Sequence, residues 1–359
     1  MADRPRDPSI TPSASFVPGT VFAGRFRLEA EIGMGGMSLV YAAHDLERDR
    51  AVALKVLRFP EKKREVGLER FRRETETLRR VNHPAIVGIE DCGVVDARTA
   101  WIAMELLDGE TLRERVERKG PLSLDELLDV IDAAAEALTY AHSFGVVHRD
   151  LKPDNLFLPR DPRVSPVKII DFGLSHVADA KKLTQTGSVV GTPRYMAPEQ
   201  IASAHTADPR VDVYALGVIV YEALTGASPF VASDHGQLLG AIISGRIEPL
   251  GRFRPDLSPD VGRVIERATA PSPDDRYASA VAFAKALRKA AEGKPVTHRE
   301  IRRPDASSRP SFPSWAGVES PVGNVGVLGR VGKVVAWAVL LGGFGASVTY
   351  IVIHALGGL

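Results

Sequence analysis

The hydrophobic pattern along the chain changes its period once. Short β-rich stretches come first: FRLEAEIG at 26–33, SLVYAAHD at 38–45, AVALKVLR at 51–58 and TAWIAMELL at 99–107. Long stretches with helical spacing dominate later, including 124–145 and 277–293. Strands followed by helices predict a two-part α+β architecture between about Phe26 and Ala291.

Two segments of different composition flank this region. Residues 1–20 are polar and Pro-rich without an apolar stretch, so we expect a disordered N-terminal tail and no signal peptide. Residues 292–333 contain five prolines with scattered Ser and Gly and predict a second, juxtamembrane linker. Basic residues outnumber acidic ones in this linker, which is compatible either with a solvated tether or with a mild attraction to anionic lipid.

An uncharged run of 20 residues, 334–353, follows the linker. As a helix it would be about 30 Å long, which matches the hydrocarbon core of a bilayer. The alternative is a buried core helix of a soluble domain. One span of this kind predicts a single-pass protein of the inner (plasma) membrane, and the positive-inside rule predicts its orientation because Arg330 and Lys333 precede the run. The bulk of the chain would be cytoplasmic and residues 354–359 a short extracytoplasmic tail.

Overall composition adds limits rather than a function. The 359 residues carry 46 Lys and Arg against 45 Asp and Glu, with 44% hydrophobic residues, which excludes a largely disordered chain, a collagen-like fibre and a many-pass membrane protein. The net charge of +1 gives no reason to expect nucleic acid as a partner. The single cysteine, Cys92, excludes an intramolecular disulfide.

Glycines gather between the first two predicted strands, at Gly33, Gly35 and Gly36. A glycine turn between antiparallel strands can place backbone N–H groups over phosphates, whereas a dinucleotide-binding fingerprint would lead into a helix. A plain Gly-rich hairpin is the alternative explanation.

A lysine and a glutamate on the next two elements form a possible pair. Lys55 lies in an apolar strand, where an ammonium group is costly unless it is paired. The helical stretch 69–80 places Glu74 on the face that also carries Phe71 and Leu78. A salt bridge between Lys55 and Glu74 would satisfy both groups, but a surface ion pair between Glu74 and a neighbouring arginine fits the spacing as well.

Polar residues gather again at 148–155, HRDLKPDN, between apolar segments, and the DFG triplet that begins at Asp171 follows another apolar stretch. Asp150 can accept a hydroxyl proton, and Lys152 can neutralise a phosphoryl group. Asn155 and Asp171 offer oxygen ligands of the kind that Mg²⁺ prefers. The two motifs in this order and at this spacing are unusual for solvated loops.

Together these motifs resemble those of a protein kinase, specifically a bacterial eukaryotic-like serine/threonine kinase with a C-terminal transmembrane helix. The resemblance covers about 26–291 and rests on these segments: the glycine-rich loop, VALK at 52–55, HRDLKPDN at 148–155, DFG at 171–173 and APE at 197–199. It implies a two-lobed fold with a β-rich N-terminal lobe and a helical C-terminal lobe, plus one transmembrane helix. It also implies ATP and Mg²⁺ (or Mn²⁺) as cofactors and protein substrates with Ser or Thr acceptors.

The resemblance assigns roles to the residues singled out above. Lys55 would hold the α- and β-phosphates and be fixed by Glu74. Asp150 would orient the acceptor hydroxyl and take its proton, and Lys152 would stabilise charge on the γ-phosphate.

Metal and adenine contacts follow in the same way. Asn155 and Asp171 would bind the Mg²⁺ ion. The adenine site would comprise the gatekeeper Met104, backbone groups at Glu105 and Leu107, and ring contacts from Val40, Ala53 and Phe157. The alternative for these apolar positions is an ordinary hydrophobic core.

The stretch from Asp171 to Glu199 resembles an activation segment. Lys152 and Thr192 favour Ser/Thr over Tyr as acceptor, since serine/threonine members of the family carry Lys and Thr at these places. We expect autophosphorylation at Thr184 or Thr186.

Two further resemblances concern architecture, and one departure concerns the loop. Asp212 resembles a helix aspartate that supports the catalytic loop, and Arg276 resembles the partner of Glu199. Ser38 stands where the family's third loop glycine would be, which is compatible with function if its φ angle is negative.

Three hypotheses remain open: an active membrane-anchored serine/threonine kinase, a pseudokinase scaffold, and a membrane protein whose kinase-like domain binds nucleotide for regulation. The intact set of motif residues favours the first. A homodimer that phosphorylates in trans is a further expectation without a strong motif behind it.

Overall fold

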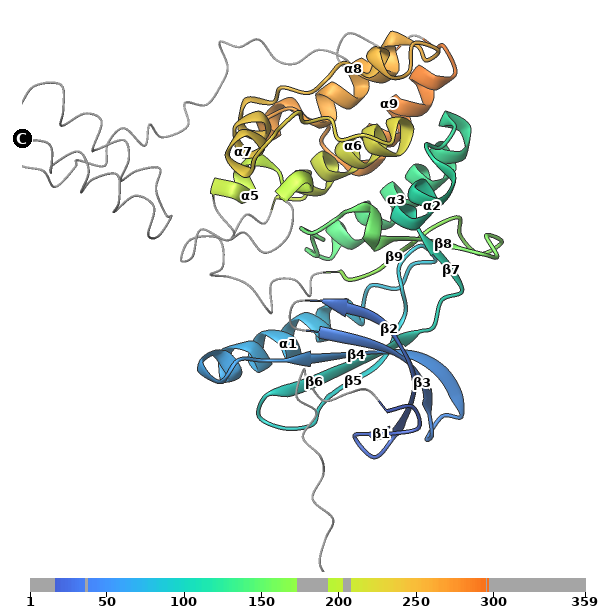
Figure 1. The fold of residues 1–359 in the computed structure, drawn as a ribbon, viewed down its shortest axis with the longest axis vertical. Helices are drawn as coiled ribbons and strands as arrows, with labels where there is room; N and C mark the ends of the chain where they lie inside the picture. The colour runs from blue at the N-terminus through green and yellow to red at the C-terminus, as the bar shows by residue number, and fades with distance from the viewer. Residues whose placement is uncertain (1–16, 36–37, 173–192, 203–207, 295, 297–359) are drawn as a thin grey trace, which may run out of the picture. The chain divides into compact units, whose positions relative to one another are not determined.

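The computed structural model describes residues 17–35, 38–172, 193–202, 208–294 and 296 (Figure 1), all within one unit of the chain. The alternating N-terminal segments form an antiparallel six-stranded sheet in the order β1-β2-β3-β4-β6-β5. Its strands are β1 (Val21–Phe22), β2 (Phe26–Gly35), β3 (Ser38–Asp45), β4 (Arg50–Arg58), β5 (Ile89–Val94) and β6 (Thr99–Glu105). The predicted strands of this region are therefore confirmed.

The register of this sheet fixes where the lysine of β4 lies. Lys55 pairs with Val40 on β3 and with Ile102 on β6, in the centre of the sheet. Two residues earlier, Ala53 pairs with Met104 on β6. Because alternate residues of a strand share a face, Ala53 and Lys55 lie on the same side of the sheet.

One helix accompanies the sheet. After the short 3₁₀ turn η1 (Glu61–Lys63), helix α1 (Arg64–Leu78) runs beside the strands in Figure 1 and buries Phe71, Thr75 and Leu78. The predicted helix over 69–80 is thus confirmed, with an earlier start and an end two residues sooner. Its buried face is the one that Glu74 shares.

The remaining helices build the second lobe, shown above the sheet in Figure 1. They are α2 (Leu112–Lys119), α3 (Leu124–Ser143), α5 (Pro198–Ala202), α6 (Arg210–Thr225), α7 (His235–Ser244), α8 (Pro259–Ala268) and α9 (Ala280–Ala291), with 3₁₀ turns η2 (Pro153–Asn155), η3 (Pro193–Tyr195), η4 (Leu250–Arg252) and η5 (Pro273–Asp275). Helix α3 begins with a capping box in which Ser123 and Glu126 satisfy each other's backbone N–H groups. Every residue of α6 from Val211 to Leu224 is buried, which makes α6 the central helix of this lobe.

A small sheet connects the two lobes. It contains β7 (Gly109–Thr111), β8 (Leu156–Pro159) and β9 (Lys168–Ile169). The segment before β5 pairs with β9: Val87 N–H donates to the Ile169 carbonyl at 3.0 Å, and Ile169 N–H donates to the Ala85 carbonyl at 2.8 Å. One hydrophobic core extends through these contacts, from β4, β6 and α1 to α3, α6 and α9.

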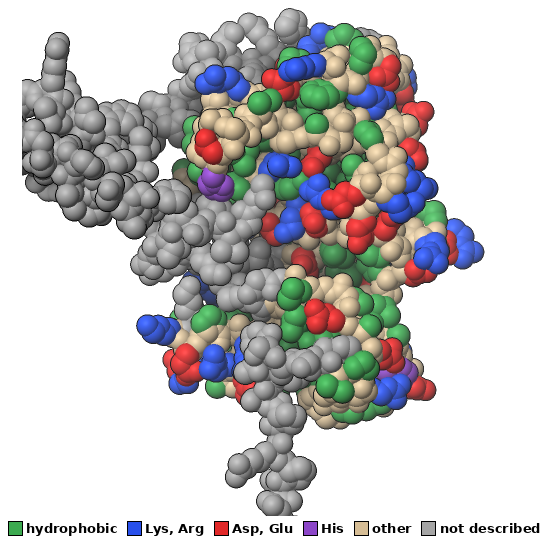
Figure 2. Space-filling model, in the orientation of Figure 1, with side chains coloured by type: hydrophobic (Ala, Val, Ile, Leu, Met, Phe, Trp, Pro, Cys, Tyr) green, Lys and Arg blue, Asp and Glu red, His purple; other side chains and the backbone are tan. Residues whose placement is uncertain are grey.

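Charge is distributed over the surface as the near-neutral composition predicts. On the face shown in Figure 2, basic and acidic side chains of the described residues are interspersed. This arrangement gives that face no extended field of a single sign.

Several predicted segments lie wholly or largely outside the described residues. Residues 17–20 of the predicted tail are described, and Gly19 and Thr20 hydrogen-bond to Leu28 of β2. Most of the predicted linker and all of 334–353 and 354–359 lie outside. Within the described part of the chain, no helix is both long and apolar enough to cross a membrane.

Candidate active site

The ammonium group of Lys55 forms the first contact of the site. Its side chain is only 8% exposed, and Nζ lies 2.7 Å from Oδ1 of Asp171, so the central strand of the sheet is bonded to the residue that follows β9. Asp171 has a φ angle of 62°, in the left-handed region that non-glycine residues rarely adopt. Backbone strain at such a position is common in functional sites.

The predicted ion pair between Lys55 and Glu74 is not formed in this structure. Oε2 of Glu74 is buried and has no hydrogen-bond partner among the described residues. Burial raises the pKa of Glu74 to about 7, although the arginines at 149, 70 and 73 partly oppose this shift. Lys55 instead bonds Asp171, and desolvation leaves Glu74 as the more weakly acidic carboxyl of the two.

The catalytic-loop motif folds into the 3₁₀ turn η2 and the residues before it. Lys152 Nζ lies 3.1 Å from Oδ2 of Asp150, and the amide nitrogen of Asn155 donates to the Asp150 carbonyl at 2.7 Å. Three predicted catalytic residues are thus within hydrogen-bonding distance of one another. The Asp150 and Lys152 side chains are both partly exposed, so a substrate can reach them.

Asp212, on α6, holds this loop in place by hydrogen bonds. Its carboxylate is fully buried and accepts the backbone N–H groups of His148 and Arg149, each at 2.9 Å. It also lies 2.7 Å from Nε2 of His142 on α3. Arg149 has a φ angle of 67°, so these bonds hold a strained backbone immediately before Asp150. The expected supporting contact of Asp212 is present.

A second set of contacts joins the loop to Asp171. The ring of His148 is buried and its Nε2 lies 3.0 Å from the Ile170 carbonyl. The same ring packs edge-on against Phe172, with 4.8 Å between ring centroids. The Ile170 N–H in turn donates to the Asn155 carbonyl at 3.0 Å. The residues on both sides of Asp171 are therefore fixed to the catalytic loop.

The oxygen atoms of Asn155 and Asp171 suit a hard divalent cation. Because the Asn155 amide nitrogen is bonded to Asp150, its side-chain oxygen is the group left to bind a ligand. Burial alone would raise the pKa of Asp171, but Lys55, His148 and Lys152 outweigh it and lower that pKa below its usual range. An amide oxygen and an ionised carboxylate are the ligand types that Mg²⁺ takes.

The predicted adenine residues lie around the junction of β6 and the small sheet. Met104 is buried, and Val40 packs against the same hydrophobic core as Ala53. Phe157 pairs with Thr111 across β7 and β8 and is half-buried.

Two of the predicted hinge residues differ in their contacts. Leu107 is partly buried against the core. The carboxylate of Glu105 accepts the Gly88 N–H at 2.8 Å and the ammonium of Lys168 at 2.6 Å. Its own N–H donates to the Gly88 carbonyl. Three bonds therefore fix Glu105, at the end of β6, to the segment before β5 and to β9.

The glycine-rich turn connects β2 and β3, as predicted from its position between two strands. Gly33 pairs with Val40, and Gly35 pairs with Ser38; Gly36 lies outside the described residues. Ser38 begins β3 and pairs with Leu57 on β4, so its backbone belongs to an extended strand, for which a negative φ is the rule. The condition under which serine fits this position is therefore met.

Further along the chain, Arg276 bonds both carboxylate oxygens of Glu199, at 2.6 and 2.7 Å. The guanidinium side chain is fully buried, and this expected contact fixes the end of the activation-segment motif to the helical lobe. The phosphorylation candidates Thr184 and Thr186 lie outside the described residues, as does Thr192.

Sequence reasoning missed His142 and Lys168, which contact Asp212 and Glu105. His142 follows the buried positions 134, 138 and 141 on α3, so helical periodicity could have placed it near the core. Lys168 stands in the apolar stretch VKII, where an ammonium group needs a partner, but no local signal identifies Glu105 as that partner.

A groove outside the site separates α1 from β5. It has a volume of about 550 Å³ and is lined by Phe71, Arg72, Thr75, Glu76 and Arg79 on α1 and by Cys92, Gly93 and Val94 on β5. The half-buried Cys92 therefore lies beside the helix that carries Glu74.

Comparison with known proteins identifies the class to which this fold and site belong. The family model described as "Protein kinase domain" matches residues 26–288. The chain belongs to the protein kinase family.

Among similar curated proteins, serine/threonine-protein kinase PknA of Mycobacterium tuberculosis (strain ATCC 25618 / H37Rv) is 41% identical over 75% of this chain and 62% of its own length. Serine/threonine-protein kinase pkn3 of Myxococcus xanthus is 37% identical over 85% of this chain and 56% of its own length. The chain thus spans less than two thirds of the length of these relatives.

Solved structures agree on the fold. The PknI kinase domain of M. tuberculosis matches 77% of this chain and all of its own length, with a TM-score of 0.61 and 31% identity. Rad53 1–466, solved in complex with AMP-PNP, matches 73% of this chain and 64% of its own length, with a TM-score of 0.60 and 31% identity.

Proposed function

We propose that this chain is a serine/threonine protein kinase that transfers the γ-phosphoryl group of ATP to Ser or Thr hydroxyls of proteins. The observation that carries the proposal is the catalytic loop: Asp150, Lys152 and Asn155 bond one another, and Asp212 anchors the loop from α6. The family match and the names of the relatives support the same activity.

In this mechanism the protein positions reactants and neutralises charge. Asp150 accepts the proton of the substrate hydroxyl as its oxygen attacks phosphorus and the bond to ADP breaks. Lys152, 3.1 Å from Asp150, lies where it can bond the transferring group. Lys55 supplies a buried positive charge for the phosphates, where the low dielectric makes that charge more effective than in water.

Asn155 and Asp171 would hold Mg²⁺, which when bound supplies charge neutralisation on the phosphates. The low pKa of Asp171 keeps its carboxylate ionised for this task over the physiological range.

Phosphoryl transfer from radiolabelled ATP by the full-length chain tests this function. Asp150→Asn should reduce incorporation by about 100-fold or more, because a positioned proton acceptor typically contributes that much. Asp161→Asn, at an exposed position in the loop after β8, is the matched control and should match the unsubstituted chain. Equal incorporation by the chain and Asp150→Asn, or none by the chain itself, would contradict the proposal. Nucleotide binding without transfer would favour a pseudokinase or a regulatory nucleotide-binding domain instead.

We also propose that residues 334–353 anchor the kinase to the inner membrane as a single helix with the kinase domain in the cytoplasm. The uncharged run and the preceding Arg330 and Lys333 support this arrangement. Alkaline extraction of membranes from cells that express the chain should leave it in the pellet. Arginine substitutions at Leu340 and Leu341 should release it, and retention of that variant would contradict anchoring.

Within the same function we propose autophosphorylation at Thr184 or Thr186, in trans within a homodimer. The polar stretch LTQTGSV supports this site, since phosphate there could pair with basic residues of the loop. Mass spectrometry should find phosphate on a tagged Asp150→Asn chain after incubation with the active chain and ATP. Unmodified Thr184 and Thr186 in the active protein would count against it.

A further inference from the structure

Arg113 on α2 contacts three elements that lie around the predicted catalytic residues. Its Nη1 donates to Oε1 of Glu222 on α6 at 2.7 Å, and its Nη2 donates to the hydroxyl of Tyr195 in η3. Its Nε lies 3.6 Å from Oδ2 of Asp154 in η2, within the catalytic-loop motif. One side chain therefore joins the catalytic loop, the turn before the APE motif and the central helix of the lobe.

The contacts of Arg113 form a closed set. The Tyr195 hydroxyl accepts from Arg113 and donates to Oε2 of Glu222, so both carboxylate oxygens of Glu222 have partners. The Glu222 side chain is only 7% exposed. A carboxylate at this depth is costly unless it is paired, so the arginine and the tyrosine are held on it together. Burial and the neighbouring Glu222 carboxylate raise the pKa of Tyr195, so its hydroxyl keeps the proton that it donates.

The segment 193–202, which contains η3 and α5, also lies against the catalytic loop. The side-chain amide of Gln200 donates to the carbonyl of Arg149 at 2.8 Å. The side-chain oxygen of Gln200 accepts the Ala197 N–H at 3.0 Å, which fixes the amide in that orientation. Arg149 immediately precedes Asp150, the predicted proton acceptor. An acceptor protein that brings its hydroxyl to Asp150 is therefore a neighbour of this segment.

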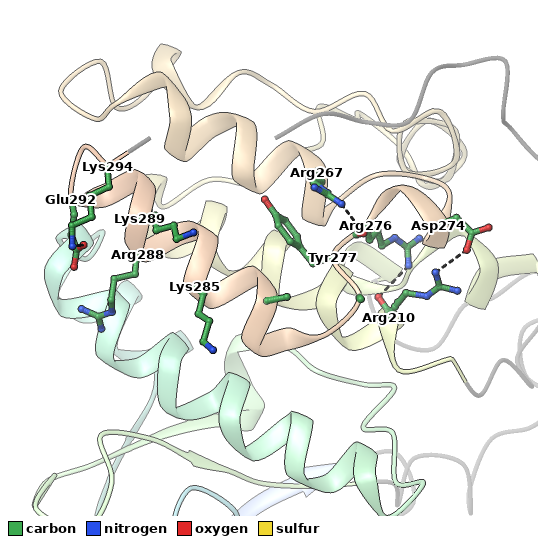
Figure 3. Close-up of a pocket in the computed structure, with 12 residues that line it drawn as sticks. Arg210, Arg267, Asp274, Arg276, Tyr277, Lys285, Arg288, Lys289, Glu292 and Lys294 are labelled. Atoms are coloured by element: carbon green, nitrogen blue, oxygen red, sulfur yellow. Dashed lines mark hydrogen bonds and ion pairs between the residues drawn. The ribbon is translucent and has the colours of Figure 1, made fainter. Parts of the chain in front are cut away.

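A second arginine, Arg276, holds the same segment by different contacts. It bonds Glu199 and also donates to the backbone carbonyls at 210, 270 and 271. Figure 3 shows Arg276 beside Arg210, at one end of a cavity of about 780 Å³ between η5, α9 and the ends of α6 and α8. These contacts fix the segment to the helical lobe. Arg113 adds a contact with the catalytic loop itself, through Asp154.

We propose that Arg113 is a positioning residue for the acceptor protein, because it sets where the segment 193–202 lies relative to the catalytic loop. The inference rests on the proposed kinase function. Arg113 acts through its contacts with Tyr195 and Asp154. The groups proposed for ATP, such as Lys55 on β4, lie on other elements. Binding of the acceptor should therefore depend on Arg113, whereas binding of ATP should not.

Steady-state kinetics of the full-length chain test this role, with myelin basic protein as the acceptor. Arg113→Ala should raise the KM for this acceptor by about tenfold, the effect expected when a charge-assisted hydrogen bond is lost. The KM for ATP should change by less than about twofold. Since the acceptor is basic, loss of a cation would by itself strengthen its binding, so a higher KM cannot be a general charge effect.

Two further variants of α2 calibrate this result. Arg118→Ala is the matched control, because Arg118 lies on the same helix with an exposed side chain that pairs with Glu110. It should match the unsubstituted chain in both KM values. Arg113→Lys keeps the charge but not the planar fork that reaches several partners, so it should restore only part of the affinity for the acceptor.

Tyr195→Phe keeps the test valid if Arg113→Ala does not fold. Removal of Arg113 leaves the buried carboxylate of Glu222 with one partner fewer, which can destabilise the lobe. Tyr195→Phe removes only the hydroxyl that joins these two residues and should raise the acceptor KM by about threefold. Urea denaturation establishes that each variant is folded under the assay conditions.

A purely structural role of Arg113 would give a different result. It would lower the fraction of folded enzyme, and hence kcat, without changing either KM. An unchanged acceptor KM in Tyr195→Phe and in folded Arg113→Ala would overturn the positioning role alone, and so would an equal rise in the KM for ATP. If the unsubstituted chain transfers no phosphate to protein, the proposed kinase function fails and this inference fails with it.

Discussion

Two carboxyl groups near the predicted catalytic residues, one fully buried and one half-buried, are held in opposite ways. Asp212 on α6 accepts hydrogen bonds from two backbone N–H groups and contacts His142, so both of its carboxylate oxygens have partners. Glu74 on α1 has a buried oxygen without a partner, and its pKa is raised to about 7. The catalytic loop is therefore fixed by bonds to a charged group, whereas the α1 side of the nucleotide site can still change its charge and its partner.

The largest expected effect comes from breaking the fixed side. Asp212→Asn replaces a carboxylate acceptor by an amide that must turn one N–H group toward other donors. Because bonds to charged groups contribute about 1.5–3 kcal/mol each, we expect unfolding free energy to fall by roughly 3 kcal/mol. Phosphoryl transfer should fall at least as much as in Asp150→Asn. Urea denaturation and initial rates measure the two effects, and a stable, active variant would contradict the role of Asp212.

Lys55→Met tests the other side, where we expect lost activity with little lost stability. The substitution removes the cation that holds Asp171, whose side chain is 37% exposed. The specificity constant for ATP should fall by about 100-fold, as when one preorganised charge donor is removed. Unfolding free energy should change by less than about 1 kcal/mol, because Asp171 can regain water. A loss of stability as large as that of Asp212→Asn would abolish the contrast.

Glu74→Gln should change how stability depends on pH. The pKa of Glu74 is about 7 in the folded chain and near its ordinary value of 4.5 when unfolded, so the folded state binds the proton more tightly. Its stabilising contribution is complete below about pH 4.5 and is lost as pH rises through 7.

Since Glu74 is partly exposed, we expect this loss to be about 2 kcal/mol. Glu74→Gln cannot ionise, so its stability relative to the unsubstituted chain should rise by that amount between pH 5 and pH 8. Glu76→Gln, at an exposed position on the same helix, is the control. Parallel stability curves for all three chains would show that Glu74 ionises normally.

Ser38→Gly should have the smallest effect. Because Ser38 belongs to the extended strand β3, the family's glycine is not needed there for backbone geometry. We expect the KM for ATP to change by less than about threefold. The free energy of unfolding should fall by about 0.5–1 kcal/mol, because glycine gives the unfolded chain more conformational entropy to lose on folding. A larger decrease in KM would mean that the serine side chain obstructs the phosphates.

The elements that carry Lys55 and Glu74 could be predicted from the sequence, but the contacts of these two residues could not. Short β-rich stretches predicted the strands around Lys55, and helical spacing predicted the helix that carries Glu74, because local burial decides both. The predicted partner of Lys55 was Glu74, and this was wrong, because Lys55 bonds Asp171 in the structure. It depends on how a strand, a helix and a loop far apart in sequence come together, which no local pattern records. The contact between Lys168 and Glu105 was missed for the same reason.

Cys92 gives this chain a practical advantage. It is the only thiol in the sequence, and it lines the groove between β5 and α1. A single fluorophore or spin label attached there would report the position of α1 without a cysteine-free background having to be built. The movement of the helix that carries Glu74 could thus be followed directly as nucleotide, pH or lipid is changed.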